Sequence, residues 1–299
     1  NHKNILIVGL GKSGIAAARF AGKKGARVTV TDMAGEKELG VHAAMAHKLG
    51  VNMELGKHDI ETFERADLIV LSPGVPHTIP PIQRAMAKGV PILGEFELAA
   101  RYIREPIIAV SGTNGKTTTA YLLEQMLVQQ GFMVGVIGTI NYRYAGKVFD
   151  NPVTTPESFD LQRILAEMVA AGITHVVMEV SSHAIDLSRI AGCAIDIGVF
   201  TNLSQDHLDY HGDMDTYWAC KQRLFTEYLP ASAARKPVQA VINADDAHGR
   251  ELAPKLAISV VLTDQSPEAD VRAQPTVCDL DVIQERLQTP QGAQDIQST

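Results

Sequence analysis

The stretch SGTNGKT (residues 111–117) decides the fold, because it joins a short apolar strand to a long helix. Residues 107–110 are typical of a buried strand, and residues 117–130 have a helical pattern that ends at Gly131. Glycines let backbone N–H groups converge on phosphate oxygens, and a helix N-terminus adds about half a positive charge. The stretch therefore predicts a phosphate-binding loop, although Val110 stands where the usual pattern has its first glycine.

Strand and helix patterns alternate before and after this loop, which is typical of parallel sheets covered by helices on both faces. Strands are expected at residues 5–9, 27–31, 67–71, 90–93, 107–110, 132–137, 175–180, 195–200, 238–242, 258–262 and 277–282. Helices are expected at residues 13–24, 36–49, 80–88, 117–130, 157–171, 213–228 and 246–255, and a small hairpin at 141–150. The predicted fold class is α/β, with a Rossmann-like N-terminal domain followed by a phosphate-loop domain whose sheet is mostly parallel.

Pro106 marks the expected domain boundary, because it interrupts a helical pattern just before a new strand. We place the boundary at residues 102–106, which gives domains 1–104 and 105–299. The polar stretch 289–299 shows no pattern of a closing element, so the chain is expected to be a piece of something longer.

The composition is that of a globular protein and excludes several classes of function. Hydrophobic residues make up 45% of the 299, enough to bury real cores, which excludes a disordered chain. The 27 basic and 34 acidic residues give a net charge of −7, which excludes a general nucleic-acid binder. No apolar stretch reaches the length of about 18 residues that a membrane span needs. Three cysteines without a CxxC pair indicate a reducing compartment, so a cytoplasmic protein is expected.

Three residues are expected to gather phosphates and a metal ion at the loop. Lys116 is placed to reach the β- and γ-phosphates, and Thr117 to coordinate Mg²⁺. Glu179 lies near the end of the strand 175–180, where ligands bind in α/β sheets, and a carboxylate opposite a phosphate loop needs Mg²⁺ to relieve repulsion. The alternatives are a glycine-rich turn with a surface lysine and a solvated glutamate at a strand end.

A second glycine-rich turn, GLGKSG at residues 9–14, follows the first strand, and Asp32 ends the second one. The spacing of 18 residues from Gly14 to Asp32 is close to that of the dinucleotide-binding fingerprint. Taken alone, the motif leaves open NAD, another nucleotide or a tight structural turn.

Two further segments carry ionisable groups whose role the pattern alone leaves open. In TNLSQDHLDYHG (residues 201–212), Asp206 and His207 either bind a metal or substrate or belong to a hydrogen-bond network of the loop. His183 either packs locally or contacts substrate. On sequence alone, Lys221 is expected to be an exposed lysine on the helix 213–228.

Five motifs resemble those of the ATP-dependent Mur ligases in order and spacing. They are GTNGKTTT (112–119), TTPES (154–158), MEVSSHAIDLSRI (178–190), FTNLSQDHLDYHGDMDTYWACK (200–221) and INADD (242–246). Over residues 105–299 the resemblance is to the tripeptide-synthetase branch of the family, which adds the third peptide residue. The first hundred residues, with GLGKSGIAAARF (9–20), TVTDM (29–33) and LSPGVP (71–76), resemble the N-terminal domain of the D-glutamate-adding branch.

This resemblance implies roles for individual residues, and it implies that the N-terminal turn holds the UDP of a muramyl substrate rather than NAD. The implied UDP-substrate-binding residues are Gly11, Lys12, Ser13, Asp32, Ser72, Pro73, Gly74, Thr154, Thr155, Ser182 and Arg189. The implied ATP-binding residues are Gly112, Thr113, Asn114, Gly115, Lys116, Thr117, Thr118, Asn243 and Asp245. The implied catalytic residues are Lys116, Glu179, His207 and Lys221. The implied Mg²⁺ ligands are Thr117, Glu179, His207 and a carbamylated Lys221. The family's third domain, and the end of the central domain, are expected to lie outside this chain.

The reaction implied by the resemblance is two-step amide formation in peptidoglycan synthesis, with ATP and Mg²⁺. A carboxylate of UDP-MurNAc-L-Ala-D-Glu attacks the γ-phosphate, and the amine of a free amino acid then displaces phosphate from the acyl phosphate. Arg189 suits a carboxylate, because its planar fork bonds two oxygens. A monomer without nucleic-acid or membrane partners is expected. The alternatives are D-glutamate addition to UDP-MurNAc-L-Ala, an NAD-dependent oxidoreductase, and a module that binds nucleotide without turnover.

Overall fold

A computed structural model describes residues 3–72, 74–95, 98, 104–234, 236–278 and 283–298. The chain divides into two compact units, Asn1–Tyr102 and Ile103–Thr299, and each has its own hydrophobic cores. Among the described residues, no helix combines the length and the apolar character needed to cross a membrane.

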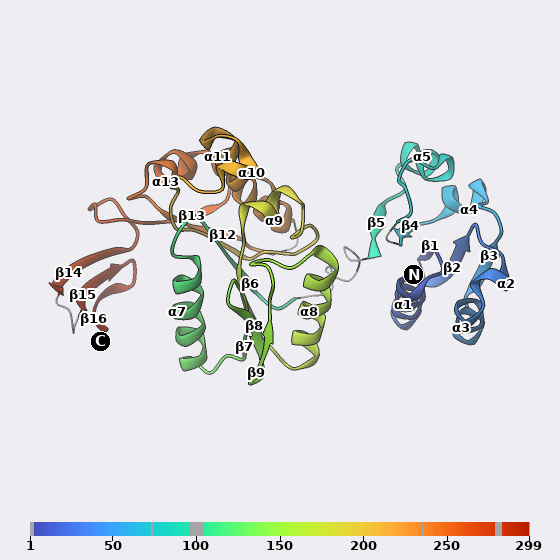
Figure 1. The fold of residues 1–299 in the computed structure, drawn as a ribbon, viewed down its shortest axis with the longest axis horizontal. Helices are drawn as coiled ribbons and strands as arrows, with labels where there is room; N and C mark the ends of the chain where they lie inside the picture. The colour runs from blue at the N-terminus through green and yellow to red at the C-terminus, as the bar shows by residue number, and fades with distance from the viewer. Residues whose placement is uncertain are drawn as a thin grey trace. The chain divides into compact units, whose positions relative to one another are not determined.

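The first unit is a five-stranded parallel sheet in the order β3-β2-β1-β4-β5. Its strands are β1 (Asn4–Val8), β2 (Arg27–Asp32), β3 (Asn52–Leu55), β4 (Leu68–Leu71) and β5 (Ile92–Gly94). Its helices are α1 (Lys12–Lys23), α2 (Glu36–Leu39), α3 (Val41–Leu49), α4 (Ile60–Arg65) and α5 (Pro80–Ala87). Figure 1 shows α1 and α3 along one face of this sheet and α4 and α5 along the other.

Alternate strand residues build one core on each face of that sheet. Ile7 of β1 packs with the residues of α1 and α3, whereas Leu6 and Val8 belong to the cluster that includes Phe63 and Ile82 of α4 and α5. Parallel strands are buried on both faces, so their sequences read as continuous apolar runs. This is why the alternation of strands and helices was visible in the sequence, and the predicted α/β class is confirmed.

Some elements of the first unit differ from the prediction. β3 and α4 were not expected: β3 is an edge strand with only partly buried side chains, so it carries no apolar run. Residues 36–49, expected as one helix, form α2 and α3, because Gly40 has φ +48° and interrupts the helical hydrogen bonds.

The second unit is built on an eight-stranded sheet in the order β13-β12-β11-β6-β10-β7-β8-β9. The strands are β6 (Ile107–Ser111), β7 (Val134–Ile137), β8 (Asn141–Tyr144), β9 (Lys147–Asp150), β10 (His175–Glu179), β11 (Ile197–Phe200), β12 (Gln239–Asn243) and β13 (Ser259–Thr263). All pairs are parallel except β7-β8 and β8-β9, and the expected hairpin at residues 141–150 is confirmed as β8 and β9. The helical segments are α7 (Lys116–Gln129), α8 (Ser158–Ala170), α9 (Ser182–Asp186), α10 (Leu208–His211), α11 (Met214–Arg223), the π-helical η1 (Leu224–Tyr228), α12 (Leu229–Ala233), α13 (Ala247–Leu252) and the 3₁₀-helical η2 (Ala253–Lys255).

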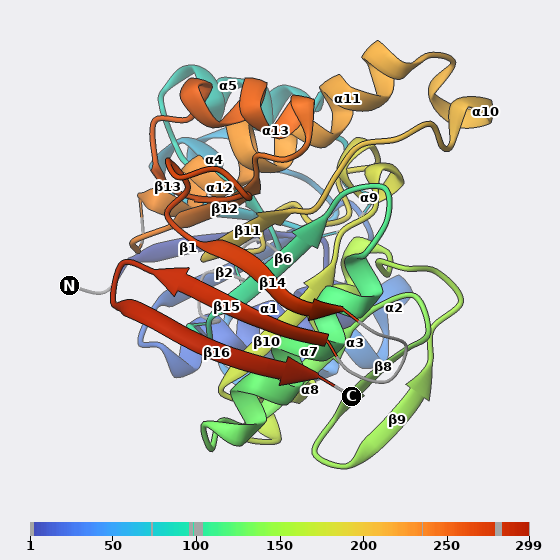
Figure 2. The same ribbon diagram turned by 90° about the vertical axis from the view of Figure 1, so that its left-hand side faces the viewer.

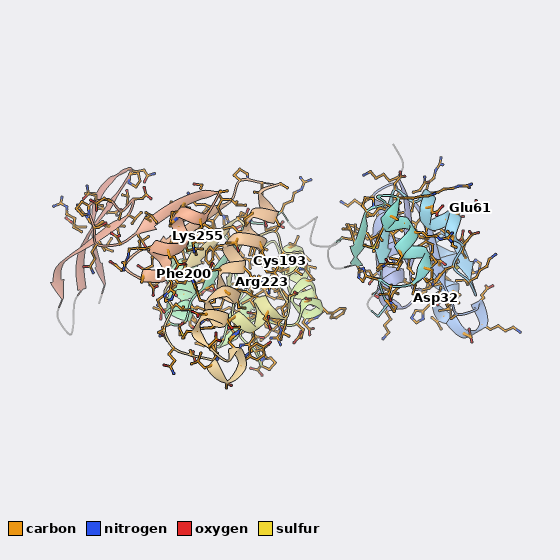
Figure 3. The ribbon with its side chains drawn as sticks, turned by 90° about the horizontal axis from the view of Figure 1, so that it is seen from above. Asp32, Glu61, Cys193, Phe200, Arg223 and Lys255 are labelled. Atoms are coloured by element: carbon orange, nitrogen blue, oxygen red, sulfur yellow. The ribbon has the colours of Figure 1, made fainter. Side chains whose placement is uncertain are left out.

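Two cores cover the faces of the second sheet. Phe200, labelled in Figure 3, lies in the larger core with Tyr217 and Phe225. On the other face, Val110 of β6 packs with Ala120 of α7. Because β6, β10, β11 and β12 are parallel neighbours, their carboxyl ends meet at one edge of the sheet, where ligands bind in folds of this kind.

The last described residues overturn one expectation. β14 (Arg272–Cys278), β15 (Ile283–Thr289) and β16 (Gly292–Ser298) form a separate antiparallel sheet, so a strand lies within the polar stretch 289–299, where no element was expected. Figure 2 shows the three strands side by side. The strands are paired through backbone bonds, and residues 292–296 of β16 are exposed, which is why no apolar pattern marks that strand. Of the strand expected at 277–282, residues 279–282 lie outside the described residues.

Candidate functional site

The phosphate loop lies between β6 and α7, as the sequence predicts, and the neighbouring strand ends hold it in shape. Backbone N–H groups of Thr113 and Asn114 donate to the main-chain and side-chain oxygens of Asn202 at 2.9 and 3.0 Å. The Thr201 hydroxyl donates to the carbonyl of Asn114 at 2.7 Å. The first turn of α7 contains no acidic residue, so its N-terminus is open to an anion.

Gly112 must be a glycine, because its backbone has φ +146° and a Cβ atom there would lie 1.9 Å from the Thr201 hydroxyl oxygen. The loop can therefore lie against the segment after β11 only without a side chain at this position. This close approach gives Asn202 and Thr201, which the sequence analysis left without a role, a direct part in shaping the loop.

Two lysines share one carbonyl of this loop. The Lys116 ammonium donates to the carbonyls of Gly112 and Thr113 at 3.0 and 2.8 Å. The Lys221 ammonium donates to the same Gly112 carbonyl at 2.8 Å. Burial lowers the pKa of Lys116, while the carboxylates of Glu179 and Asp206 act in the opposite direction.

Lys221 is not the exposed helix lysine that sequence alone predicts. It lies near the end of α11 with 1% of its surface exposed, and its ammonium sits 4.8 Å from the centre of the Tyr217 ring. The Tyr217 and Thr113 hydroxyls form a hydrogen bond of 3.2 Å, which ties α11 to the loop. Burial above all, and then the positive charge of Lys116, lowers the pKa of Lys221 to about 7.

Glu179 and Thr117 meet at the mouth of the loop. The Glu179 carboxylate, 2% exposed, accepts the Thr117 hydroxyl at 2.9 Å. It also accepts the backbone N–H and the hydroxyl of Thr139, both at 3.0 Å. A hydroxyl and a carboxylate from neighbouring elements are the hard oxygen donors that Mg²⁺ prefers, and a buried carboxylate facing this loop is suited to a cation.

The ring of His207 lies beside that of Tyr217, with the two ring centres 6.2 Å apart. Its backbone is left-handed, with φ +53°, and its side chain is 43% exposed beside Asp206. The ring of His183 meets it edge to face at 5.1 Å between centres. Within the described ranges, no three His, Cys, Asp or Glu side chains gather as a ready metal site. A metal here would depend on Thr117, on a modified Lys221 or on bound phosphates.

The residues expected to bind the peptide of the UDP substrate are linked by hydrogen bonds that lead to Glu179. The Thr154 hydroxyl lies 3.1 Å from that of Thr139. The Thr155 hydroxyl donates to the Glu179 carbonyl at 2.9 Å, and Arg189 donates to the Thr155 carbonyl at 3.1 Å. The Thr155 side chain is buried, as is Ser182, whereas the Arg189 guanidinium is also paired with Glu157 and leaves its Nε without a partner.

Asn243 and Asp245 lie at the end of β12, beside the loop. Asn243 donates to the Thr201 carbonyl at 2.7 Å and accepts the Asp245 N–H at 3.0 Å. Both line a pocket of about 310 Å³ with side chains from β13 and from the β14–β15 sheet. The sequence analysis missed its other lining residues, Thr263, Asp264, Gln265, Val271, Ala273 and Leu287. A polar run directly after the strand expected at 258–262 points to Thr263, Asp264 and Gln265, whereas no local pattern points to the other three.

In the first unit, a pocket of about 610 Å³ opens at the carboxyl ends of β1 and β2. Asp32 and Gly74 line it, as do Lys57 and His58, which the sequence analysis missed. Asp32, labelled in Figure 3, accepts the Leu10 N–H at 2.7 Å and the Ala34 N–H at 2.9 Å. Both of its oxygens thus hold the backbone of the turn.

The other residues expected at the UDP site have different surroundings. Gly11, Lys12 and Ser13 form the start of α1 and are not among the lining residues of the pocket. Ser72 is buried and donates to the Gly9 carbonyl at 3.1 Å and to the carboxylate of Glu95. Glu95 is a further missed residue, and burial raises its pKa. Pro73 lies outside the described residues.

Comparisons with known protein families give one match in each of the two units. The family description "Mur ligase middle domain" matches residues 110–297, and "Mur ligase MurD-like, N-terminal domain" matches residues 3–94. The mixed resemblance expected from the sequence, with different branches in the two parts, is thereby confirmed.

The individual relatives include ligases of both branches. The UDP-N-acetylmuramoyl-L-alanyl-D-glutamate--2,6-diaminopimelate ligase of Geobacter metallireducens is 49% identical over 187 residues, which are 62% of this chain and 37% of that protein. The UDP-N-acetylmuramoylalanine--D-glutamate ligase of Desulfatibacillum aliphaticivorans is 42% identical over 233 residues, 78% of this chain and 47% of that protein. This chain thus spans less than half the length of these two relatives.

A solved structure of a UDP-N-acetylmuramoyl-L-alanyl-D-glutamate--2,6-diaminopimelate ligase has 25% sequence identity and a TM-score of 0.57. The match covers 98% of this chain and 52% of that one. Since the middle-domain description alone covers more than half of the residues and includes the phosphate loop, Glu179 and Lys221, the chain belongs to the Mur ligase family.

Proposed function

We propose that this chain carries the nucleotide-binding and UDP-substrate-binding parts of a ligase that uses ATP to add the third amino acid to UDP-MurNAc-L-Ala-D-Glu. The observation that carries the proposal is the convergence of Lys116 and Lys221 on the Gly112 carbonyl, beside the Thr117–Glu179 pair. A carboxylate and a triphosphate are both anions, and their reaction needs positive charge held in place at the phosphate loop.

The donor set fits Mg²⁺ as the accompanying cation. Thr117 and Glu179 would hold one ion through a hydroxyl and a carboxylate that are 2.9 Å apart. His207 and a carbamylated Lys221 would hold a second ion. When bound, Mg²⁺ supplies charge that offsets the repulsion between the two reacting anions.

The chain's own residues would position the reactants for two steps. In the first step, a substrate carboxylate oxygen forms a bond to the γ-phosphorus, and the bond from that phosphorus to ADP breaks. In the second step, the amino nitrogen of the incoming amino acid bonds to the acyl carbon, the bond to phosphate breaks, and the amine loses a proton to solvent. Lys116 would stabilise charge on the transferred phosphoryl oxygens, and Arg189 would orient the substrate carboxylate.

Lys221 has the properties that carbamylation requires. With a pKa of about 7, a large fraction of this amine is neutral at neutral pH, whereas an ordinary lysine is almost fully protonated. The neutral nitrogen bonds to the carbon of CO₂ and releases a proton, which turns a cation into an anion. An anion at Lys221 would also replace the repulsion between the two lysines by an attraction to Lys116.

The choice of the third residue rather than the second rests on the central unit. Its relative at 49% identity is named as a ligase that acts on UDP-N-acetylmuramoyl-L-alanyl-D-glutamate. The second candidate, D-glutamate addition to UDP-MurNAc-L-Ala, is favoured by the match of residues 3–94 to the MurD-like N-terminal domain and by the relative at 42% identity.

Isothermal titration calorimetry on this chain distinguishes these candidates. UDP-MurNAc-L-Ala-D-Glu, UDP-MurNAc-L-Ala and NAD are titrated separately, each with and without a non-hydrolysable ATP analogue and Mg²⁺. We expect tighter binding of the dipeptide substrate. Preference for UDP-MurNAc-L-Ala would favour D-glutamate addition, and binding of NAD alone would overturn the ligase proposal.

A further inference from the structure

Two short helices, α9 and α10, hold one another beside the candidate metal site. The Ser182 hydroxyl and His211 Nε2 form a buried hydrogen bond of 2.9 Å. The Tyr210 hydroxyl donates to an oxygen of Asp186 at 2.8 Å. The rings of His183 and Tyr210 pack with their centres 4.1 Å apart. We call these five residues, three from α9 and two from α10, the α9–α10 clamp.

The clamp fixes a backbone conformation that His207 would not keep by itself. His207 precedes α10 and has φ +53° and ψ +28°, the left-handed region that residues with a Cβ seldom adopt. Its carbonyl accepts the N–H groups of Tyr210 and His211 at 3.1 and 3.0 Å. The two clamp residues on α10 therefore also hold the backbone of His207.

α10 is too short to define its own position. It is a single turn of four residues, and a helix of that length is not stable without tertiary contacts. The contacts to α9, together with the packing of the His211 ring against Tyr217 of α11 at 5.1 Å between centres, therefore decide where α10 lies. The position of α9 is in turn fixed at the end of β10, where the Thr155 hydroxyl accepts the Ser181 N–H at 3.2 Å, two residues after Glu179.

We propose that His211 is a positioning residue for metal binding: through its hydrogen bond to Ser182 it fixes α10, and α10 presents His207 to the second ion, which a carbamylated Lys221 would also hold. This inference rests on the proposed function, because it takes His207 as a metal ligand. Ser182 and His211 are both buried, so the loss of either partner leaves the other without its hydrogen bond. The pair is thus a strong constraint on the distance between α9 and α10.

The test measures Mn²⁺ binding to the whole chain, with AMP-PNP present, by the electron paramagnetic resonance signal of free Mn²⁺. Two Mn²⁺ ions are expected to bind with different affinities. His207→Ala is the reference variant, and we expect it to lower the affinity for the more weakly bound ion. His211→Phe keeps an aromatic ring and removes the hydrogen bond, and we expect a loss of about 10- to 100-fold in the same affinity. His211→Gln keeps a group that bonds the Ser182 hydroxyl, and we expect an affinity within about threefold of the unmodified chain.

Two tyrosine variants provide a matched comparison. Tyr210→Phe removes only the hydroxyl that bonds Asp186, and this side chain is partly exposed, so folding is not at risk. The Tyr228 hydroxyl donates to the Ile185 carbonyl of α9 at 3.3 Å but does not belong to α10. We expect Tyr210→Phe to weaken the Mn²⁺ affinity and Tyr228→Phe to leave it unchanged.

The outcomes separate this inference from the proposed function. If His207→Ala weakens Mn²⁺ binding and His211→Phe does not, the positioning role is wrong while the metal role of His207 stands. If His207→Ala has no effect although AMP-PNP binds, His207 is not a ligand and the inference is overturned with that part of the proposal. Should His211→Phe fail to fold, Ser182→Ala removes the same hydrogen bond from its other partner, and an unchanged Mn²⁺ affinity in that variant overturns the inference.

Discussion

The buried ammonium of Lys221 lowers the stability of the folded chain, and the proposed carbamylation gives a functional reason for that cost. A buried ammonium has lost its hydration, and here a second ammonium, Lys116, lies on the same carbonyl. This cost lowers the pKa of Lys221 to about 7, and loss of the proton above that pH relieves it. The lysine is therefore poised between a cation and a neutral nucleophile at the pH of a cell.

Replacement of Lys221 by methionine, which has a similar volume and no charge, tests this cost. We expect Lys221→Met to raise the free energy of unfolding at pH 7 by roughly 1–3 kcal/mol. From about pH 7 to pH 10 the unfolded chain holds the Lys221 proton that the folded chain has lost, so the stability of the unmodified protein rises with pH. The advantage of the variant should thus shrink between pH 7 and 9.5 in urea titrations. An advantage that stays constant would contradict the lowered pKa.

Lys116 provides a second test at the residue scale, this time of ligand binding. Its ammonium now donates to loop carbonyls, and with nucleotide bound it is expected to turn to the phosphates. Lys116→Ala should weaken binding of the ATP analogue by roughly 10- to 100-fold in calorimetry. Binding of UDP-MurNAc-L-Ala-D-Glu should stay nearly intact. In the longer protein the same variant should abolish ligation, and substantial turnover would sink the phosphate-loop assignment.

At the scale of elements, the loop between β6 and α7 depends on its contact with the segment after β11. Gly112→Ala places a Cβ atom 1.9 Å from the Thr201 hydroxyl oxygen, at φ +146°. Because Thr201 also donates to the Asn114 carbonyl, the loop and its partner must both move. We expect the variant to lose measurable binding of the ATP analogue and roughly 1–3 kcal/mol of stability.

Gly146→Ala is the control for Gly112→Ala, since it shares a positive φ of +73° but has no atom within 4 Å of the new Cβ. Gly146 lies at the tip of the β8–β9 hairpin, about 30 residues after the phosphate loop in the sequence. It should cost only the backbone strain, about 1 kcal/mol, and leave nucleotide binding unchanged. Equal loss of nucleotide binding in both variants would show that strain, rather than the close approach, is responsible.

At the scale of the whole molecule, the two units have separate hydrophobic cores and are expected to lose stability separately. Gly14→Ala would place a Cβ atom 2.0 Å from the Gly9 carbonyl oxygen and push α1 away from the turn after β1. Hydrogen exchange measured by mass spectrometry should then speed up in residues 3–72 and stay unchanged in residues 104–234. Gly22→Ala on the same helix meets no atom within 4 Å and should stabilise α1 by up to about 1 kcal/mol. Faster exchange in both units of Gly14→Ala would contradict independent cores.

The sequence by itself determined the α/β class, the position of the phosphate loop between a strand and a helix, and the placement of Glu179 at a strand end opposite that loop. These features depend on local information: apolar runs mark strands that are buried on both faces, and glycine spacing marks a turn whose backbone must approach other groups closely. Apart from a strand expected at 277–282, the β14–β16 sheet was not predicted, because its strands are held by backbone pairing that leaves no clear apolar pattern in the sequence.

Only the tertiary structure decided how each polar side chain is used. Lys221 and Gly112 are 109 residues apart, and their contact makes a buried, easily deprotonated amine of what the helix pattern shows as a surface lysine. In the same way, Asp32 accepts the backbone N–H of Leu10 in the turn after β1, and the Ser182 hydroxyl is bonded to His211. Burial and partners come from segments distant in the chain, and no local pattern records them, because desolvation depends on everything that packs around a group.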